Sequence, residues 1–458
     1  MSLDPTAAET PDALIGQPQT STVGLGIWEL AWPAILGNLL HSTVAIVDGV
    51  AVGSLGAPAL AAATAGERIF FVLQAVLMGV TAGTTALVAR AWGGGQRDEA
   101  SRVTSASLFL CLGVAAVASL LGIAFTPQLL GIFGLDDLTT GLAVTYVRWL
   151  LLFNPFFAIY FALGAALRAA GDTRTPLWIG ALANVLNAAL IFPLVFGSFG
   201  FPSLGIAGAA IAGGSSFAVC GVLFVWLWQR GSLAVRGGGP GSIERKRVER
   251  IARIGYPAAL EQGAFQLGFV IFLWFLASYG SDAPAAYGVG GRVLAFSFVI
   301  GSGFSVAAST LVGQHLGAGD PAGAARSGWR STFIATALMA VFGLAITLAA
   351  EPIARFVIDD DDVVRLAVIF IYILGAVQPL MALEFCLAGA LRGAGDTRFP
   401  LVVVLAGMLV VRSSLAGLAA WWGLSVGWVF AALIGDYTVK ALLLTGRFRS
   451  GRWQHAVR

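Results

Sequence analysis

The sequence predicts an all-α membrane protein whose twelve transmembrane helices form two pseudo-symmetric six-helix lobes. The first supporting observation is composition: 58% of the 458 residues are apolar and only 11% are charged, whereas about a quarter of the residues in soluble domains are charged. The second is that apolar segments of about 20 residues, the length that crosses a bilayer, recur along nearly the whole chain. The third is a repeated sequence that relates the two halves. Together they leave no room for a separate soluble domain.

The first six spans form the predicted N-lobe, residues 25–229, and the last six form the C-lobe, residues 251–446. A cytoplasmic linker, residues 230–250, joins the lobes, and residues 447–458 form a cytoplasmic tail. Residues 1–24 are polar and lack the basic and apolar regions of a signal peptide, so we expect an uncleaved, disordered cytoplasmic N-terminus. We place the twelve spans at residues 25–53, 58–89, 103–125, 141–167, 176–197, 204–229, 252–279, 284–314, 330–350, 362–391, 399–423 and 425–446.

The charges between the spans predict the orientation of the protein. Arg and Lys gather on alternate connections, including the run from Arg245 to Arg253, while the acidic run from Asp359 to Asp362 lies on the opposite side. By the positive-inside rule, both termini of this multi-pass protein of the inner (plasma) membrane are cytoplasmic. The basic residues are dispersed, with a net charge of +3, so no nucleic-acid partner is expected. The three cysteines lack the spacing of a disulfide framework or a metal site.

The two lobes are related by a repeat. LRAAGDTRTPL, which begins at Leu167, reappears as LRGAGDTRFPL at Leu391, an offset of 224 residues. The same offset pairs Pro33 with Pro257, Arg68 with Arg292 and Gly93 with Gly317. Because each half has an even number of spans, both lobes have the same orientation, as in transporters built from parallel repeats that rock against each other. The alternative, a duplicated bundle without a moving site, is less favoured.

Several motifs accompany the repeat. They are the repeated LR-x-x-GDTR-x-P-L, PAILGN at Pro33, VDGVAVGSLG at Val47, PAALEQ at Pro257 and TLVGQHLGAGD at Thr310. Together they resemble the MATE (multidrug and toxic compound extrusion) family. The resemblance extends from about Ile27 to Arg447 and implies a V-shaped pair of lobes that expels amphipathic, often cationic, compounds in exchange for protons or sodium ions.

Within that family, Asp48, fifteen residues after Pro33, resembles the DinF-like, proton-coupled branch. The resemblance implies that Asp48 is the protonation site and that Pro33 lets the first helix bend. The chain departs from some of those relatives because its fifth span has no second acid and carries Asn184 and Asn187 instead. This departure puts a two-carboxylate mechanism in doubt.

Asp48 is also a candidate on physical grounds. An Asp at the centre of a membrane helix costs at least about 2.5 kcal/mol on insertion scales, so it needs a function or a partner. The repeat places Phe272 at the equivalent position of the C-lobe, and such an asymmetry points to chemistry rather than to shared architecture. Burial favours the neutral form of a carboxylic acid, which allows its charge to act as a switch. The alternative is a solvated Asp near the outer end of the span.

Other polar residues are candidates to line an N-lobe cavity. His41 precedes Asp48 by two helical turns and shares its face, so it is either a proton relay or gate, or a packed, hydrogen-bonded histidine. The amides either bind the acid or a substrate, or join helices by hydrogen bonds. Asn154 has Gln378 as its partner in the repeat, which favours a structural role. The amide candidates are Asn38, Gln74, Asn154, Asn184 and Asn187.

The C-lobe carries charges of both signs at membrane depth. Asp436 and Lys440 are spaced i,i+4 on one helix, and Arg412 needs an acid from a neighbouring span. We favour a structural ion-pair cluster over a second coupling or substrate site; the candidates are Glu261, Glu384, Arg412, Asp436 and Lys440. Arg68 and Arg292 occur in both halves and are interpreted as lobe architecture.

The predicted function is secondary active multidrug export, by alternating access and with proton antiport. No Walker A, HExxH or GxSxG motif is present, so we expect neither an enzyme nor a cofactor. Sodium coupling, with Glu261 supplying oxygen ligands, is an alternative, as is a flippase for lipid-linked precursors, which should have a more basic cavity. A membrane-embedded enzyme is a weaker alternative. The expected partners are lipid and amphipathic, cationic small molecules, bound by a monomer.

Overall fold

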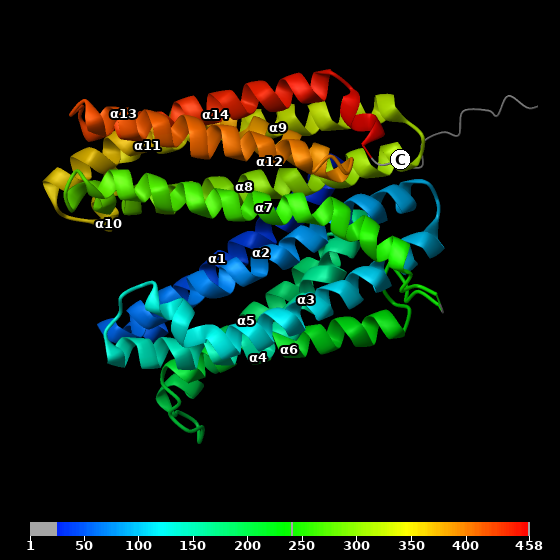
Figure 1. Cartoon of the computed structure of the whole chain (residues 1–458), viewed down its shortest axis with the longest axis horizontal. Coiled ribbons are helices and arrows are strands. Elements are labelled where there is room, and N and C mark those ends of the chain that lie inside the picture. The colour runs from blue at the N-terminus through cyan, green and yellow to red at the C-terminus, as the bar shows by residue number, and fades with distance from the viewer. Residues whose placement is uncertain (1–24, 240, 457–458) are drawn as a thin grey trace, which may run out of the picture.

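The computed structural model describes residues 25–239 and 241–456 (Figure 1). Residues 1–24, predicted to be a disordered terminus, lie outside this part of the chain. The twelve predicted spans are confirmed as helices long and apolar enough to cross a membrane. The N-lobe consists of α1 (Ile27–Gly53), α2 (Ala57–Gly93), α3 (Arg97–Gly131), α4 (Asp137–Ala170), α5 (Arg174–Phe196) and α6 (Ile206–Gln229).

The C-lobe repeats this order with two additions. Its spans are α7 (Arg245–Ala277), α8 (Asp282–Gly317), α9 (Pro321–Leu348), α11 (Asp361–Gly393), an eleventh span in three parts, and α14 (Val426–Arg449). The eleventh span consists of α12 (Arg398–Val404), a π-helix, η2 (Leu405–Arg412), and α13 (Ser413–Trp421). A short helix, α10 (Ala350–Val357), precedes α11, and the 3₁₀ helix η3 (Arg452–His455) follows α14. Neither η2 nor α10 was predicted, because a π-helix has no distinct periodicity and α10 is only eight residues long.

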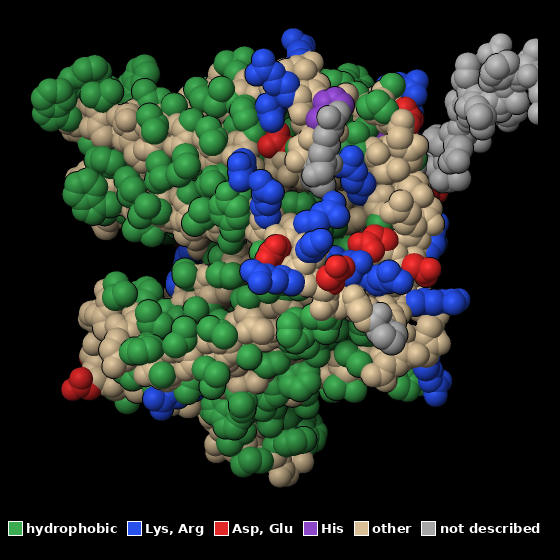
Figure 2. Space-filling model, turned by 45° about the vertical axis from the view of Figure 1, so that its right-hand side comes forward, with side chains coloured by type: hydrophobic (Ala, Val, Ile, Leu, Met, Phe, Trp, Pro, Cys, Tyr) green, Lys and Arg blue, Asp and Glu red, His purple; other side chains and the backbone are tan. Residues whose placement is uncertain are grey.

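The lobes form a V. They pack together at the end that carries the C-terminus, here called the closed end, and diverge towards α10, at the open end (Figure 1). The arms are covered mainly by hydrophobic side chains, while Lys, Arg, Asp and Glu gather at the closed end (Figure 2). This distribution matches lipid-facing arms and one polar membrane boundary.

At the closed end, α2 and α8 cross in a pseudo-symmetric contact. A β-carbon on Gly93 would overlap the backbone of Gln314, and one on Gly317 would overlap the backbone of Arg90, so glycine is needed at both crossing points. The Gln314 side chain also donates a hydrogen bond of 2.9 Å to the carbonyl oxygen of Ala169, at the end of α4. The C-lobe therefore binds a helix end of the N-lobe directly.

The helix boundaries show how far the repeat extends. α3 and α9 begin 224 residues apart, at Arg97 and Pro321, and so do α5 and α12, at Arg174 and Arg398. The offset falls to 220 at the last pair, because α6 begins at Ile206 and α14 at Val426. The register of the repeat thus holds up to the start of the fifth helix of each lobe, whereas the fifth helix of the C-lobe contains η2, which α5 lacks, and the sixth helix is shifted.

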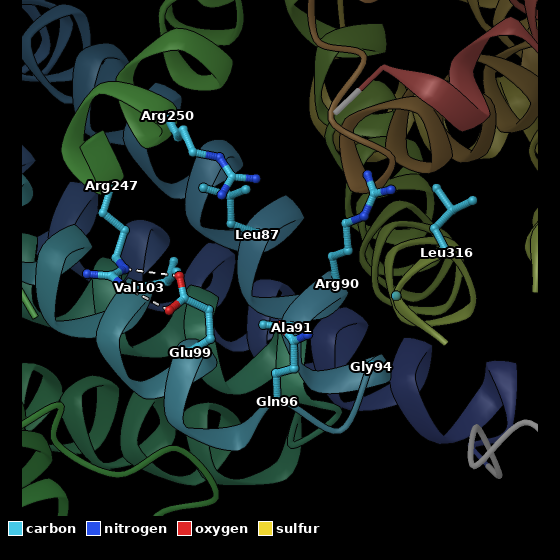
Figure 3. Close-up of a pocket in the computed structure, with 11 residues that line it drawn as sticks. Leu87, Arg90, Ala91, Gly94, Gln96, Glu99, Val103, Arg247, Arg250 and Leu316 are labelled. Carbon is cyan, nitrogen blue, oxygen red and sulfur yellow. Dashed lines mark hydrogen bonds and ion pairs between the residues drawn. The ribbon is translucent and has the colours of Figure 1, made fainter. Parts of the chain in front are cut away.

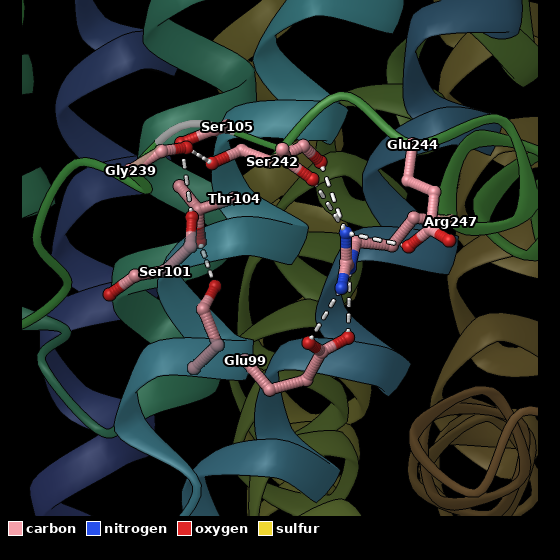
Figure 4. A network of polar contacts seen from close by, with 10 residues as sticks. Glu99, Ser101, Thr104, Ser105, Gly239, Ser242, Glu244 and Arg247 are labelled. Carbon is pink, nitrogen blue, oxygen red and sulfur yellow. Dashed lines mark hydrogen bonds and ion pairs between the residues drawn. The ribbon is translucent and has the colours of Figure 1, made fainter.

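The connection between the lobes is docked on the N-lobe. α7 begins at Arg245, so the last residues of the predicted linker are helical. Before it, Val235 is buried, and the amide of Gly238 donates a 2.9 Å hydrogen bond to Ser105 Oγ of α3. Arg247 then forms a two-pronged ion pair with Glu99 of α3, with two N–O distances of 3.0 Å (Figure 4).

That ion pair borders a pocket of about 300 Å³ between α2, α3, α7 and α8. Arg90 and Arg250 also point towards this pocket (Figure 3). The closed end therefore carries a basic pocket whose one carboxylate, that of Glu99, is already paired.

Candidate functional site

α1 is held mainly at its two ends. Its buried residues lie near the start, at Leu30, Ala31 and Pro33, and again at Ala51 and Val52, while the turns between them are not buried. Pro33 lies inside the helix and cannot donate a backbone hydrogen bond there. A helix with a central part that is loosely packed and a proline near its start has room to bend.

The first half of α1 contacts both lobes, since Glu29 O near its start accepts a 3.3 Å hydrogen bond from Thr173 of the N-lobe, whereas the second half contacts the N-lobe. Near its start, Ala31 and Ile35 pack against Gly303 of α8, in the C-lobe. One turn later, Asn38 Nδ2 donates a 2.8 Å hydrogen bond to Ser302 Oγ of the same helix. The second half returns to the N-lobe, where Asn187 Nδ2 of α5 donates a 2.8 Å hydrogen bond to Asp48 Oδ1. Asp48 thus lies at the point where α1 is attached to its own lobe.

A second carboxylate belongs to the same group. Tyr146 of α4, which is 7% exposed, donates a hydrogen bond of 3.4 Å to Glu67 Oε1 of α2. The Tyr146 ring belongs to the hydrophobic cluster against which Val47, the residue before Asp48, also packs. Asp48, Glu67, Tyr146 and Asn187, here called the N-lobe cluster, contain no cationic side chain. The two acids differ in their surroundings: Arg68 lies next to Glu67 on the same cavity wall, whereas Asp48 is hydrogen-bonded by a neutral amide and contacts no cation among the described residues.

The main cavity lies between the lobes rather than within the N-lobe, which corrects the predicted location. It measures about 790 Å³, and Figure 2 shows the hollow that separates the arms. The N-lobe wall includes Asn38, His41, Glu67 and Arg68, and the C-lobe wall is largely aromatic. The aromatic residues of that wall are Phe265, Phe269, Tyr287, Phe298 and Tyr437.

The other predicted lining residues are dispersed. Asn154 is 1% exposed and donates hydrogen bonds of 3.2 Å to Ala115 O and Ser119 Oγ, so it joins α4 to α3, in line with the structural role that its repeat partner favoured, and it does not line the cavity. Gln74 is likewise buried, at 5% exposure, inside the helix packing. Asn184 is half-buried on α5, one turn before Asn187. Of the five amides, Asn38 lies on the cavity wall and Asn187 contacts Asp48.

The charged residues of the C-lobe form a closed network. Asp436 of α14 pairs with Arg412 of η2 and lies 3.3 Å from Lys440 Nζ, which is itself 3.1 Å from Glu384 Oε1 of α11. The side chains of Asp436 and Lys440 are fully buried. Gly407 makes room, because a β-carbon there would overlap Asp436 and Lys440. We call these four charged residues the C-lobe cluster; its formal charges cancel.

Glu261 is not part of this network, which corrects its predicted grouping. Its carboxylate lies 2.8 Å from Arg392 Nη1, and Arg392 Nη2 donates a second hydrogen bond, of 3.3 Å, to Ser305. Glu261 lines a separate cavity of about 260 Å³ between the lobes, together with Arg168, the repeat partner of Arg392. It is therefore a paired acid near the closed end.

Sequence reasoning missed Glu67 and Tyr146. The signal was present, because the offset of 224 pairs Glu67 with Gly291 and Tyr146 with Phe370. Both are polar residues in one lobe only, like Asp48. Glu67 was overlooked beside Arg68, which has an Arg partner in the other lobe and suggested shared architecture. Arg68 also lines the cavity, with its guanidinium 5.7 Å from the ring centre of Phe269.

Comparison with known proteins identifies the family. A family model described as MatE matches residues 33–192 and again residues 257–418, once in each lobe. The chain belongs to the MATE family. The double match confirms the internal repeat, and each match begins at the proline of the first helix of its lobe, Pro33 or Pro257.

Relatives cover nearly the whole MATE chain. It is 30% identical to a probable multidrug resistance protein NorM of Thermotoga maritima over 439 residues, which are 93% of this chain and 92% of that protein. It is 29% identical to a probable multidrug resistance protein NorM of Deinococcus radiodurans, over 92% of this chain and 95% of that one. The fold superposes on the crystal structure of the Vibrio cholerae MATE transporter VcmN with a TM-score of 0.86, at 21% identity, covering 93% of this chain and 97% of that one.

Proposed function

We propose that this MATE-family chain is a multidrug exporter that exchanges organic compounds for protons, with Asp48 as the protonation site. The observation that carries the proposal is that Asp48 is bound by a neutral amide, that of Asn187, and by no cation within residues 25–239 and 241–456. A carboxylate in such surroundings gains from taking up a proton, whereas one in a salt bridge does not. The C-lobe cluster, with its charges cancelled, lacks this property.

Protonation of Asp48 acts on α1. The Asp48 carboxylate accepts a charge-assisted hydrogen bond from Asn187, of a kind worth about 1.5–3 kcal/mol, and a proton on Asp48 weakens it. The start of α1 stays attached to α8 through Asn38, so the released half bends at the loosely packed turns after Pro33. The bend moves the part of α1 that lies at the edge of the main cavity, and this part of the helix then displaces a bound compound.

The arrangement of the lobes supports alternating access. The cavity opens towards the open end, and the closed end is sealed by the α2–α8 crossing. Basic residues gather at the closed end, which by the positive-inside rule is cytoplasmic, as are both termini. The structure then corresponds to an outward-facing state, and parallel repeats allow the lobes to rock into the opposite one.

The alternative functions have weaker support. A flippase for lipid-linked pyrophosphates needs an excess of cations in the cavity, but Arg412 is paired with Asp436 and Arg68 lies beside the acid Glu67. Sodium coupling through Glu261 requires a free carboxylate, whereas this one is paired with Arg392. The first observation disfavours a pyrophosphate-bearing substrate, and the second disfavours sodium binding at Glu261.

The test is transport in liposomes that contain the purified protein. Export of a cationic dye is measured with a proton gradient alone and with a sodium gradient alone, for the wild type, Asp48→Asn and the control Asp359→Asn. Asp359 is an exposed acid of the connection before α11, so its removal should leave transport unchanged. We expect proton-driven transport by the wild type and the control, and at least a tenfold loss in Asp48→Asn. Sodium-driven transport that Asp48→Asn retains would overturn the proposal.

A further inference from the structure

We propose that Glu67 is the residue that recognises the positive charge of the exported compound, and that it does so from one wall of the main cavity only. The inference rests on the proposed export function and adds a specificity-determining residue to it. Glu67 is exposed on α2, and it lines the cavity of about 790 Å³ between the lobes.

The side chain of Glu67 is positioned by α4, which packs against α2 on the side away from the cavity. Gly66 allows α4 to approach α2 so closely that a β-carbon on Gly66 would lie 2.8 Å from the Tyr146 ring. The Tyr146 hydroxyl then donates a hydrogen bond to one carboxylate oxygen of Glu67, 3.4 Å away. A single neutral donor orients the carboxylate without cancelling its charge. The other oxygen, Oε2, accepts no hydrogen bond from the described residues and is free to accept one from a ligand.

The charges around Glu67 leave it as the acid available to a ligand. Arg68, next to Glu67 on the same wall, reduces the negative potential there, but its guanidinium is directed towards Phe269 and forms no ion pair of 4.0 Å or less with Glu67 in the described chain, so the carboxylate is not occupied. Arg412, from η2, is paired with Asp436, and His41, from α1, lies on the same cavity wall. Among the cavity-lining residues, Glu67 is the one carboxylate.

The opposite wall supplies a different kind of contact. At the repeat partner of Glu67 stands Gly291, which lines the same cavity and whose β-carbon would meet no atom within 4 Å. Around it are the aromatic rings of the C-lobe wall, whose faces attract cations and bury apolar groups. The ligand that fits these two walls is an aromatic or amphipathic compound with one cationic centre. Its cationic centre is directed towards the N-lobe.

Because Gly291 has no side chain, a carboxylate can be introduced there to test whether the cation can be bound from the opposite wall. The wild type, Glu67→Gln, Gly291→Glu and the double variant are purified in detergent, and binding of two probes of similar shape is measured at fixed pH. The probes are the cation methyltriphenylphosphonium and the neutral triphenylphosphine oxide. We expect Glu67→Gln to weaken binding of the cation about tenfold, equivalent to about 1.4 kcal/mol, and to leave binding of the neutral probe unchanged. The double variant should regain most of the affinity for the cation, because it presents a carboxylate from the other wall.

Three results would overturn the inference. The first is that the wild type shows no preference for the cation, or does not bind it. The second is that Glu67→Gln weakens binding of both probes equally, which indicates a structural role. The third is that the double variant stays as weak as Glu67→Gln, which indicates that Glu67 acts through Tyr146 and Asp48. Binding at fixed pH needs no ion gradient. None of these outcomes therefore decides whether Asp48 couples transport to protons, which the transport assay tests separately.

Discussion

The two lobes have the same order of helices, but their two charged clusters occupy positions that do not correspond in the repeat. The N-lobe residues Asp48, Glu67 and Tyr146 correspond to Phe272, Gly291 and Phe370 of the C-lobe. The reverse holds for Glu384 and Arg412 of the C-lobe, whose partners at the same offset are Tyr160 and Ala188.

The two clusters also differ in balance and in access to solvent. In the C-lobe cluster two acids meet two bases, with side chains between 0% and 16% exposed. In the N-lobe cluster two acids meet only an amide and a phenol, and Glu67 faces the cavity. A balanced buried cluster fixes one arrangement of helices, whereas an unbalanced one changes its interactions when a proton or a cation arrives. The C-lobe cluster thus stabilises one arrangement of its helices, whereas the N-lobe cluster responds to the arrival of a proton or a cation.

The largest expected effect comes from unbalancing the C-lobe cluster. Lys440→Met leaves Asp436 and Glu384 without their shared cation, and a buried pair broken on one side costs about 3–5 kcal/mol. We expect a large fall in the thermal unfolding temperature of the purified protein. Adding Glu384→Gln restores the balance and should recover part of the loss, while Asp48→Asn alone should change stability little. An unfolding temperature of Lys440→Met equal to that of the wild type would show that the cluster is not structural.

A smaller effect, on the pH profile of transport, is expected when a residue of the N-lobe cluster is replaced by its repeat partner from the C-lobe. The repeat partner of Asn187 is Val411, so Asn187→Val removes the amide that favours the charged form of Asp48. Protonation becomes easier, so the pH profile of transport should move upwards by about one to two pH units, equivalent to 1.5–3 kcal/mol. The matched control is Asn184→Val, one turn away on α5. Equal profiles for both variants would contradict a specific link between Asn187 and Asp48.

The smallest effect concerns the lobe connection. Arg247→Gln removes the ion pair with Glu99, which is partly buried and has no equivalent in the C-lobe, where Gly323 replaces the acid. We expect a loss of stability of about 1 kcal/mol that diminishes in high salt. Arg245→Gln, which breaks a fully solvated pair with Glu249, serves as the control and should have no measurable effect. A loss as large in the control would show that the docked linker is not specific.

The sequence was sufficient for the framework of this fold and for part of the site. Apolar length located all twelve spans, and the i,i+4 spacing of Asp436 and Lys440 correctly indicated a contact. The repeat singles out Asp48, and it distinguishes Glu67 in the same way, because Gly291 stands at the equivalent position of the C-lobe. Contacts between distant segments were not predictable in this way. Arg392 pairs with Glu261 across 131 residues, and Asn154 turns away from the cavity, because helix rotation is set by packing that a hydropathy pattern does not encode.

The most direct test of the account is the number of protons released when a cationic compound binds to the purified protein in weakly buffered solution. If Asp48 exchanges its proton for the compound, the wild type releases protons on binding, Asp48→Asn releases almost none, and Glu67→Gln releases them once the compound is supplied at a concentration that restores binding. Proton release by Asp48→Asn equal to that of the wild type would contradict the account.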